Sequence, residues 1–139
     1  MAFIVWKDEY NLGIKKIDEQ HRSLADTMNE MFQMFLDKKM TDENFKIITQ
    51  KLIEYVNVHF NTEQEYFLES AYEKTQIHTS VHDQMRLRAE ELKVKYDQPN
   101  SNKETLFFEL AEFLQAIWVW HINSFDKEYV PCLHAHNIY

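Results

Sequence analysis

Glycine, proline and cysteine are nearly absent from this chain of 139 residues, which has one Gly, two Pro and one Cys. The stretch from Ile14 to Gln98 contains neither Gly nor Pro, whereas an all-β chain would need many turn-forming residues over that length. Because Cys132 is alone, an intramolecular disulfide and a cysteine-ligated metal cluster are both excluded. These shortages predict an all-α protein, in which long helices are joined by short polar turns.

Long apolar runs and clusters of positive charge are missing as well. The sequence has no run of about 18 apolar residues, so we expect no transmembrane helix. Its N-terminus also lacks the features of a signal peptide, and we therefore expect a soluble, cytoplasmic protein. The formal net charge is −8 and no cluster of Lys and Arg stands out, which argues against a nucleic-acid partner. Highly charged helix faces lead us to expect a monomer.

Hydrophobic residues make up 45% of the chain, which is enough for one sizeable core in a domain of this length. Their spacing of three and four residues predicts helices at about 18–37, 41–71, 75–96 and 101–129, after an N-terminal arm over 1–17. Asp18 is the expected N-cap of the first helix, and a capping box from Ser101 to Glu104 is expected to open the fourth. Short connections favour antiparallel neighbours, so we expect residues 1–139 to form a single domain, an up-down-up-down four-helix bundle with an N-terminal arm.

Polar side chains occupy inward positions on all four predicted helices. They are His21 on the first, His59 and Glu63 on the second, His78 and His82 on the third, and His121 on the fourth. A single inward histidine is more often a core residue bonded to a neighbour, and Glu63 alone could lie on an exposed flank. Burying all six without partners would cost several kcal/mol each. Taken together, they predict a metal centre.

The types and spacing of these residues narrow the choice of metal. His59 with Glu63 and His78 with His82 are i, i+4 pairs, so each pair lies on one face of its helix. Imidazole and carboxylate ligands without thiolate favour iron or manganese, and five imidazoles exceed the needs of a single zinc ion. The His-Glu-x-x-His motif of zinc proteases and the Glu-x-x-His motif of carboxylate-rich di-iron proteins are both absent.

Taken in order, the motifs resemble those of the hemerythrin family. Its pattern is an isolated histidine followed by His-x-x-x-Glu, His-x-x-x-His and His-x-x-x-x-Asp, and here the last of these runs from His121 to Asp126. The run Ile17-Asp18-Glu19-Gln20-His21 and the arm with Trp6 and Gly13 are also similar, so the resemblance covers nearly the whole chain.

This resemblance implies an oxygen-bridged pair of iron ions that binds dioxygen reversibly for carriage, storage or sensing, rather than an enzyme. One iron would be held by His78, His82 and His121. The other would be held by His21 and His59, with a position left free for dioxygen, and Glu63 and Asp126 would bridge the two.

Two features depart from simple expectations. Five residues at 100° each place Asp126 about 140° around the helix from His121, so the family's role for it requires a local distortion or a reach to the other ion. Without the resemblance, we would interpret Asp126 as an exposed acidic residue near the C-terminus. The family also often has Trp-Leu-x-x-His before its last histidine, whereas this chain has Ile117-Trp118-Val119-Trp120-His121. Helical spacing predicts that Trp118 faces the metals and that Trp120 points away.

Reversible dioxygen binding needs a dry pocket. Its expected wall residues are Trp118, Ile117, Phe60, Leu24, Ala25 and Phe67, although ordinary core packing is the alternative for each. The other function that we consider is a di-iron enzyme or redox sensor acting on peroxide or nitric oxide. That activity would need a proton donor, for which Tyr55 and Tyr66 lie on the inward half of their helix. His134 and His136 are expected to lie in a solvated tail.

Overall fold

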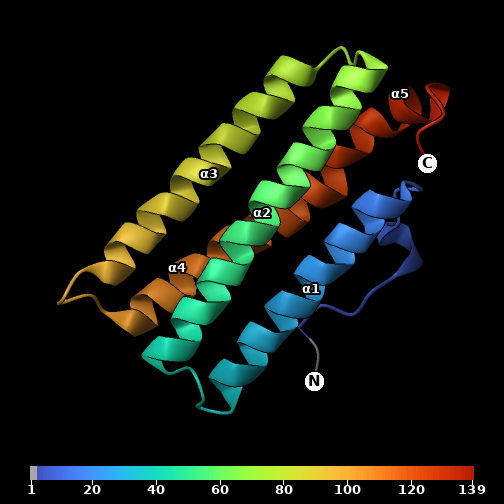
Figure 1. Ribbon diagram of the computed structural model, residues 1–139. Helices are drawn as coiled ribbons and strands as arrows, with labels where there is room; N and C mark the ends of the chain where they lie inside the picture. The colour runs from blue at the N-terminus through green and yellow to red at the C-terminus, as the bar shows by residue number, and fades with distance from the viewer. Residues whose placement is uncertain (1–2) are drawn as a thin grey trace.

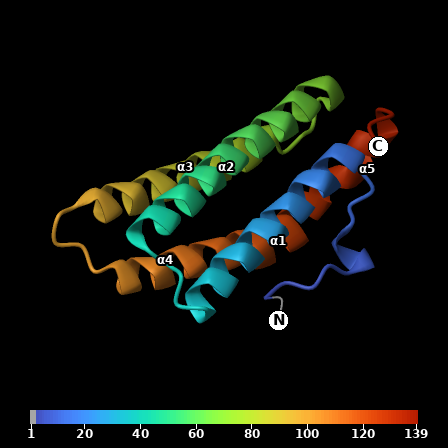
Figure 2. The same cartoon turned by 60° about the horizontal axis from the view of Figure 1, so that its bottom comes forward.

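Four long helices run in alternating directions along one axis (Figure 1). The structure, a computed structural model, describes residues 3–139, so the first two residues of the expected arm lie outside it. The helices are α1 (Lys15–Leu36), α2 (Asp42–Ser70), α3 (Thr75–Asp97) and α4 (Lys103–Ala116). Figure 2 shows α1 beside α4 and α2 beside α3. No strand occurs among the described residues, and the predicted all-α, up-down-up-down four-helix bundle is confirmed.

Helix α1 begins three residues earlier than predicted, and Asp18 is not its N-cap. The Asp18 carboxylate instead accepts hydrogen bonds from the backbone N–H of Leu12 at 2.7 Å and of Gly13 at 3.1 Å. Ile14 occupies the N-cap position without a side-chain bond. Gly13 has a φ of +85°, a backbone conformation that glycine adopts without strain. Asp18 therefore secures the turn that leads from the arm into α1.

The N-cap of α4 lies one residue later than predicted, and the helix begins at Lys103 rather than near residue 101. Asn102, not Ser101, is the N-cap, and its side chain accepts a hydrogen bond from Thr105 N at 3.1 Å. The Ser101 hydroxyl donates instead to the carbonyl of Tyr96 at 3.1 Å. The predicted capping box is therefore wrong, although a polar residue does cap this helix.

The fourth helical segment changes its hydrogen-bonding pattern as it approaches the C-terminus. Helix α4 continues into a π-helical segment, η2 (Ile117–Phe125), then a 3₁₀ segment, η3 (Asp126–Tyr129), and a short helix, α5 (Val130–Ala135). Within η2, Asn123 Nδ2 donates to the carbonyl of Trp118 at 2.6 Å, five residues back. Asn and Ser side chains compete in this way with the regular backbone bonds of an α-helix, which favours the wider turn.

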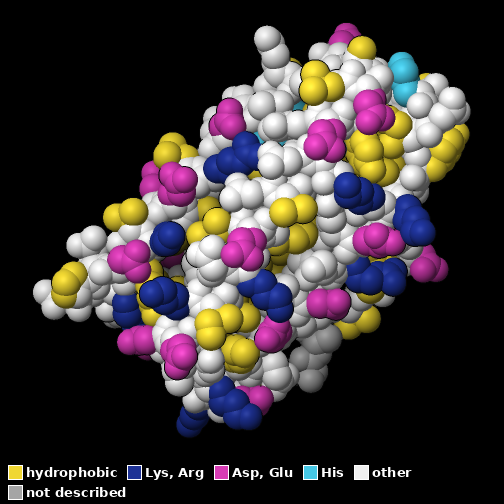
Figure 3. Space-filling model, viewed as in Figure 1, with side chains coloured by type: hydrophobic (Ala, Val, Ile, Leu, Met, Phe, Trp, Pro, Cys, Tyr) yellow, Lys and Arg dark blue, Asp and Glu magenta, His cyan; other side chains and the backbone are white. Residues whose placement is uncertain are grey.

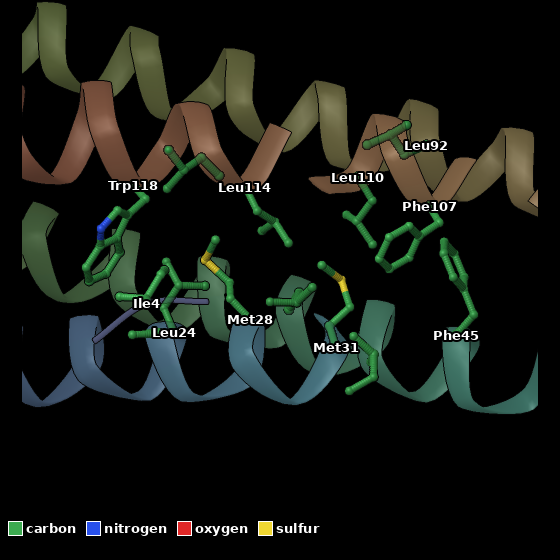
Figure 4. Close-up of a cluster of buried hydrophobic side chains, with 14 of the residues drawn as sticks. Ile4, Leu24, Met28, Met31, Phe45, Leu92, Phe107, Leu110, Leu114 and Trp118 are labelled. Carbon is green, nitrogen blue, oxygen red and sulfur yellow. The ribbon is translucent and has the colours of Figure 1, made fainter. Parts of the chain in front are cut away.

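Apolar side chains form two clusters separated along the bundle axis. In the larger one, Leu24, Met28 and Met31 of α1 point toward Leu110, Leu114 and Trp118 (Figure 4). The smaller cluster comprises Leu12, Ile14, Ile17, Phe67, Tyr72, Tyr129 and Leu133. On α1, His21 falls between Ile17 of the smaller cluster and Leu24 of the larger one. His21, one of the predicted metal ligands, therefore lies between the two apolar clusters.

The N-terminal arm packs along α1 and covers one flank of the larger cluster. Asn29 holds it by accepting from Ile4 N at 2.6 Å and donating to Ile4 O at 2.8 Å. The rings of Trp6 and Tyr10 meet Trp118 edge-on, with centroids 6.0 and 5.2 Å away. These contacts bury Trp118, which is 6% exposed, while Trp120 is 77% exposed, as helical spacing predicts.

The outer surface carries intermixed charges. On the face in Figure 3, Lys and Arg alternate with Asp and Glu, and hydrophobic side chains appear in small groups. Ion pairs such as Lys51 with Glu30 at 3.1 Å and Lys74 with Glu128 at 3.2 Å connect neighbouring elements. Among the described residues, no helix combines the length and the apolar character that crossing a membrane requires.

Candidate metal centre

Five histidines and two carboxylates form a buried polar layer across all the helices of the bundle. None of these seven side chains is more than 2% exposed. They are His21 on α1, His59 and Glu63 on α2, His78 and His82 on α3, His121 on η2, and Asp126 at the start of η3. The structure thus brings together every residue that the sequence motifs had singled out.

Their donor atoms form two groups, and within each group the atoms lie within 4.8 Å of one another. The first group contains Glu63, His78, His82 and His121, and the second contains His21, His59, Glu63 and Asp126. The Nε2 atoms of His82 and His121 are 3.1 Å apart, and those of His21 and His59 are 3.2 Å apart. Each group therefore has imidazole nitrogens converging on a common point.

Glu63 connects the two groups. Its Oε1 contacts Nε2 of His59 in the second group. Its Oε2 lies 2.9 Å from Nε2 of His78 and 3.7 Å from Nε2 of His82, both in the first group. One carboxylate thus offers one oxygen to each group.

Asp126 makes the same connection from the start of η3. Its Oδ2 lies 3.3 Å from Nε2 of His21, and its Oδ1 lies 3.1 Å from Nε2 of His78 and 3.0 Å from Nε2 of His121. The π-helical segment explains how it reaches this position, because the Asp126 N–H donates to the carbonyl of His121, five residues back. In this i→i+5 pattern, residues five apart lie about one turn apart, so the local distortion that the sequence required is η2.

Burial and mutual charge divide the imidazoles into two kinds. Burial lowers the pKa of His59 and His78, but Glu63 and Asp126 outweigh it and raise both pKa values to about 9. Burial lowers the pKa of His82 to about 3. Burial and the Asp126 charge raise the pKa of Glu63, but contacts with His59 and His78 lower it to about 2. The carboxylates of this layer are therefore negatively charged. Protonated imidazoles supply the positive charge that balances them.

The unpaired atoms of this layer fit a pair of metal ions. Both oxygens of Glu63 and of Asp126 lack hydrogen-bond partners among the described residues, and each lies near at least one imidazole nitrogen. Buried carboxylates in that position are costly unless a cation or proton neutralises them. Imidazole and carboxylate donors without thiolate suit iron and similar transition metals. The cluster is thus suited to metal binding.

The six predicted wall residues are all buried, but they lie in different places. Leu24, Ala25, Ile117 and Trp118 share the larger apolar cluster. Phe60 stacks on His82, with ring centroids 3.7 Å apart and planes at 3°. Phe67 belongs to the smaller cluster, where its ring meets His78 edge-on at 4.9 Å. The first four therefore belong to one apolar cluster, whereas Phe60 and Phe67 each contact an imidazole ring.

The remaining histidines lie outside the centre. His134 Nε2 is 2.9 Å from the carbonyl of Gly13, and His136 Nδ1 is 2.9 Å from the carbonyl of Cys132. Among residues 3–139, neither belongs to a group that could hold a metal. His134 nevertheless joins the tail to the arm, a contact between distant segments that no local sequence pattern predicts.

Gln20 is a contact of the centre that sequence reasoning missed. Its Oε1 lies 2.7 Å from Nδ1 of His59, on the side of the ring away from Glu63. Gln20 is only partly buried, and a polar residue at such a position has no helical periodicity that marks it. Its place directly before His21 is the one signal that the sequence offered.

Comparisons with known proteins agree with this geometry. The family model described as the hemerythrin HHE cation binding domain matches residues 12–133. A bacteriohemerythrin of Clostridium acetobutylicum is 34% identical over 132 residues, which cover 91% of this chain and 98% of that protein. A bacteriohemerythrin of Methylococcus capsulatus is 28% identical over 140 residues, covering 97% of this chain and all of that protein (100%).

Solved structures show the same fold. A crystal structure of a hemerythrin variant superposes with a TM-score of 0.76 at 24% identity, covering 96% of this chain and 98% of that chain. The matches in sequence and fold extend over the helices that carry all seven buried polar residues. The chain therefore belongs to the hemerythrin family.

Proposed function

We propose that the seven buried residues hold two iron ions and that the protein binds dioxygen reversibly, as a carrier, store or sensor. The observation that carries this proposal is the sharing of carboxylates. Glu63 and Asp126 each direct one carboxylate oxygen to the first group of imidazoles and the other oxygen to the second group. Such sharing suits two adjacent ions held as a pair and has no use in a site for a single ion.

The two groups would hold their ions unequally. His78, His82 and His121 would hold one iron, whereas His21 and His59 would hold the other. With one imidazole fewer, the second ion has the smaller set of protein ligands, which is the arrangement that leaves room for a small molecule. When bound, the iron pair supplies the two electrons that dioxygen takes up on binding and returns on release.

The contribution of the chain itself is to keep water out. Leu24 is 0% exposed, Ala25 3% and Ile117 3%, and the arm residue Ile4 packs in the same cluster. A dry surface beside the ligands prevents water from displacing a bound small molecule or delivering protons to it. This supports reversible binding over chemistry that consumes the ligand, and on this ground we propose that the protein is not an enzyme.

One observation favours the second candidate, a di-iron enzyme or redox sensor acting on peroxide or nitric oxide. The Tyr55 ring stacks on His59, with centroids 5.5 Å apart and planes at 11°. Its hydroxyl is buried without a hydrogen-bond partner among the described residues. Burial and the charges of Glu63 and Asp126 raise the pKa of Tyr55 well above its usual value, so the group keeps its proton. Tyr66 is the weaker candidate because it packs against the smaller apolar cluster, whereas the Tyr55 ring stacks on His59.

An optical experiment separates these functions. The iron-loaded protein is reduced anaerobically, exposed to air and then flushed with argon, while its visible spectrum and iron content are recorded. We expect two irons per chain and a colourless reduced form, with a visible band that appears in air and disappears under argon. An oxidised spectrum that argon does not reverse would favour the enzyme or redox sensor.

Two variants make the test specific to the site. His78→Ala removes a residue of the buried layer and should lower the iron content and abolish the air-induced band. His136→Ala changes an exposed histidine of the tail and should leave both unchanged. Wild-type protein that takes up no iron after reconstitution would overturn the di-iron proposal.

A further inference from the structure

The Nδ1 atoms of the five buried histidines have unequal surroundings. Nδ1 of His59 lies 2.7 Å from Oε1 of Gln20. Nδ1 of His21, His78, His82 and His121 has no hydrogen-bond partner among residues 3–139. Among the described residues, one imidazole of the centre, that of His59, therefore has a hydrogen-bond partner at Nδ1, the ring nitrogen that faces away from the centre. This imidazole belongs to the group with two histidines.

Gln20 is in turn held by a second bond. Its Nε2 donates to Oγ1 of Thr62 at 3.0 Å, and the Thr62 hydroxyl donates to the carbonyl of Val58 at 3.0 Å. Thr62 is 5% exposed, so its hydroxyl has little competition from solvent. The contacts form one chain from the backbone of α2, through Thr62 and Gln20, to the ring of His59.

The polarity of this chain has only one solution. The Val58 carbonyl can only accept, so the Thr62 hydroxyl donates its single proton there and accepts from the Gln20 amide. The Gln20 oxygen then faces His59 and must accept from Nδ1–H. In the neutral imidazole this leaves the lone pair on Nε2, the atom that contacts Glu63 and lies 3.2 Å from Nε2 of His21.

We propose that Gln20 and Thr62 are positioning residues for His59, which set its tautomer and ring orientation and thereby strengthen metal binding in the two-histidine group alone. This inference rests on the proposed metal centre. The hydrogen bond to Nδ1 increases electron donation from Nε2, as outer partners of metal-binding histidines generally do. The same ring is confined on another side by the parallel ring of Tyr55.

Gln20 lies at a groove on the protein surface, whereas Thr62 lies in the interior. Gln20 and Tyr55 both line an open groove of about 460 Å³ between α1 and α2, which Lys16, Lys51 and Glu54 also line. The acceptor for His59 is thus close to solvent. Thr62, whose hydroxyl oxygen orients Gln20 by accepting a hydrogen bond from its Nε2, is buried. If Thr62 loses its hydroxyl, the Gln20 amide loses the contact that fixes which of its ends faces His59.

Four variants test the proposal. Gln20→Leu removes the acceptor, and Thr62→Val removes only the hydroxyl that orients it, at nearly constant shape. Thr62→Ser keeps that hydroxyl and should restore wild-type behaviour. Thr27→Val is the matched control. The Thr27 hydroxyl also donates to a carbonyl four residues back, at 3.0 Å, and Thr27 is 6% exposed, but this hydroxyl has no hydrogen bond to an imidazole among the described residues.

The first measurement is a titration of metal-free protein with Zn²⁺ against a competing chelator. We expect two ions to bind wild type, Thr27→Val and Thr62→Ser. In Gln20→Leu, one of the two ions should bind about 10- to 100-fold more weakly and the other as before, with a smaller loss of the same kind in Thr62→Val. Unchanged affinity for both ions, or an equal loss for both, would overturn the proposal.

A second measurement follows the proton itself. In the Zn²⁺-loaded protein, the ring N–H resonances of the histidines are recorded by ¹H–¹⁵N NMR, together with their exchange with water. The Nδ1–H of His59 should exchange slowly in wild type, Thr27→Val and Thr62→Ser, and rapidly in Gln20→Leu and Thr62→Val. Equal exchange in all five proteins would overturn the proposal, whereas wild-type protein that binds no metal would overturn the proposed function itself.

Discussion

Two tryptophans, two residues apart on one helical segment, permit a sharp test of how the core is packed. Trp118 is 6% exposed and meets both Trp6 and Tyr10 edge-on, whereas Trp120 is 77% exposed. Trp118→Ala should therefore leave a cavity beneath the arm. Trp120→Ala should remove only a surface side chain, in the same π-helical segment and with the same change of composition.

The expected magnitudes differ clearly. Truncating a buried tryptophan to alanine costs about 3–5 kcal/mol in free energy of unfolding, of which the two edge-on ring pairs supply about 0.5–1.5 kcal/mol each. Since domains are stable by roughly 5–15 kcal/mol, Trp118→Ala should remove a large part of the total. In a domain of this size each kcal/mol lowers Tm by about 3–5 °C, so we expect a fall of roughly 15 °C. Trp120→Ala should change the free energy by less than about 0.5 kcal/mol.

Urea titration and calorimetry of the two variants measure these changes. Equal losses in both, or a loss below about 1 kcal/mol in Trp118→Ala, would refute the reasoning, because they would mean that the arm does not close over a packed core. A large loss in Trp120→Ala would point instead to an effect on the π-helical segment, which both substitutions share.

Two further predictions concern the turn before α1 and the polar layer. Asp18→Ala removes the acceptor of two backbone N–H groups, so denaturant titration should show a loss of about 2 kcal/mol; an unchanged midpoint would contradict this role. In the metal-free protein, the pKa of about 9 for His59 and His78 lies above the usual value of 6.5, so their stabilising contribution is complete below pH 6.5 and is lost as pH rises through 9. The free energy of unfolding of metal-free protein, measured with urea, should accordingly fall over that window; a flat profile would refute the assignment.

Helical periodicity was sufficient for the polar layer wherever the helices are regular. His59 with Glu63 and His78 with His82 lie in α-helices, so a rotation of about 100° per residue places each pair on one face. Trp118 and Trp120 were also separated correctly, although they lie in η2, because residues two apart point in widely different directions in a π-helical turn as well as in an α-helical one. The absence of Gly and Pro over a long stretch was likewise enough to predict long helices.

Helical periodicity was insufficient where the backbone leaves the α-helical pattern. It was also insufficient where a contact with another segment determines the role of a side chain. Asp126 could not be placed from spacing, because η2 follows i→i+5 bonding. Asp18 was misplaced as a cap because its carboxylate bonds to arm residues that precede it. Gln20 was missed because its role depends on His59, 39 residues away.

The π-helical segment has a consequence for how the chain tolerates changes in length. A turn closed by an i→i+5 bond contains one residue more than an α-helical turn, so the chain between His121 and Asp126 holds one residue in surplus. Removing exposed Ser124 would return this stretch to α-helical geometry and separate His from Asp by the same four positions as the other two pairs. Tyr129 and Leu133 would follow in nearly the same orientation toward the small apolar cluster. A single-residue deletion, which would rotate everything after it in a regular helix, is here a change that the bundle can absorb.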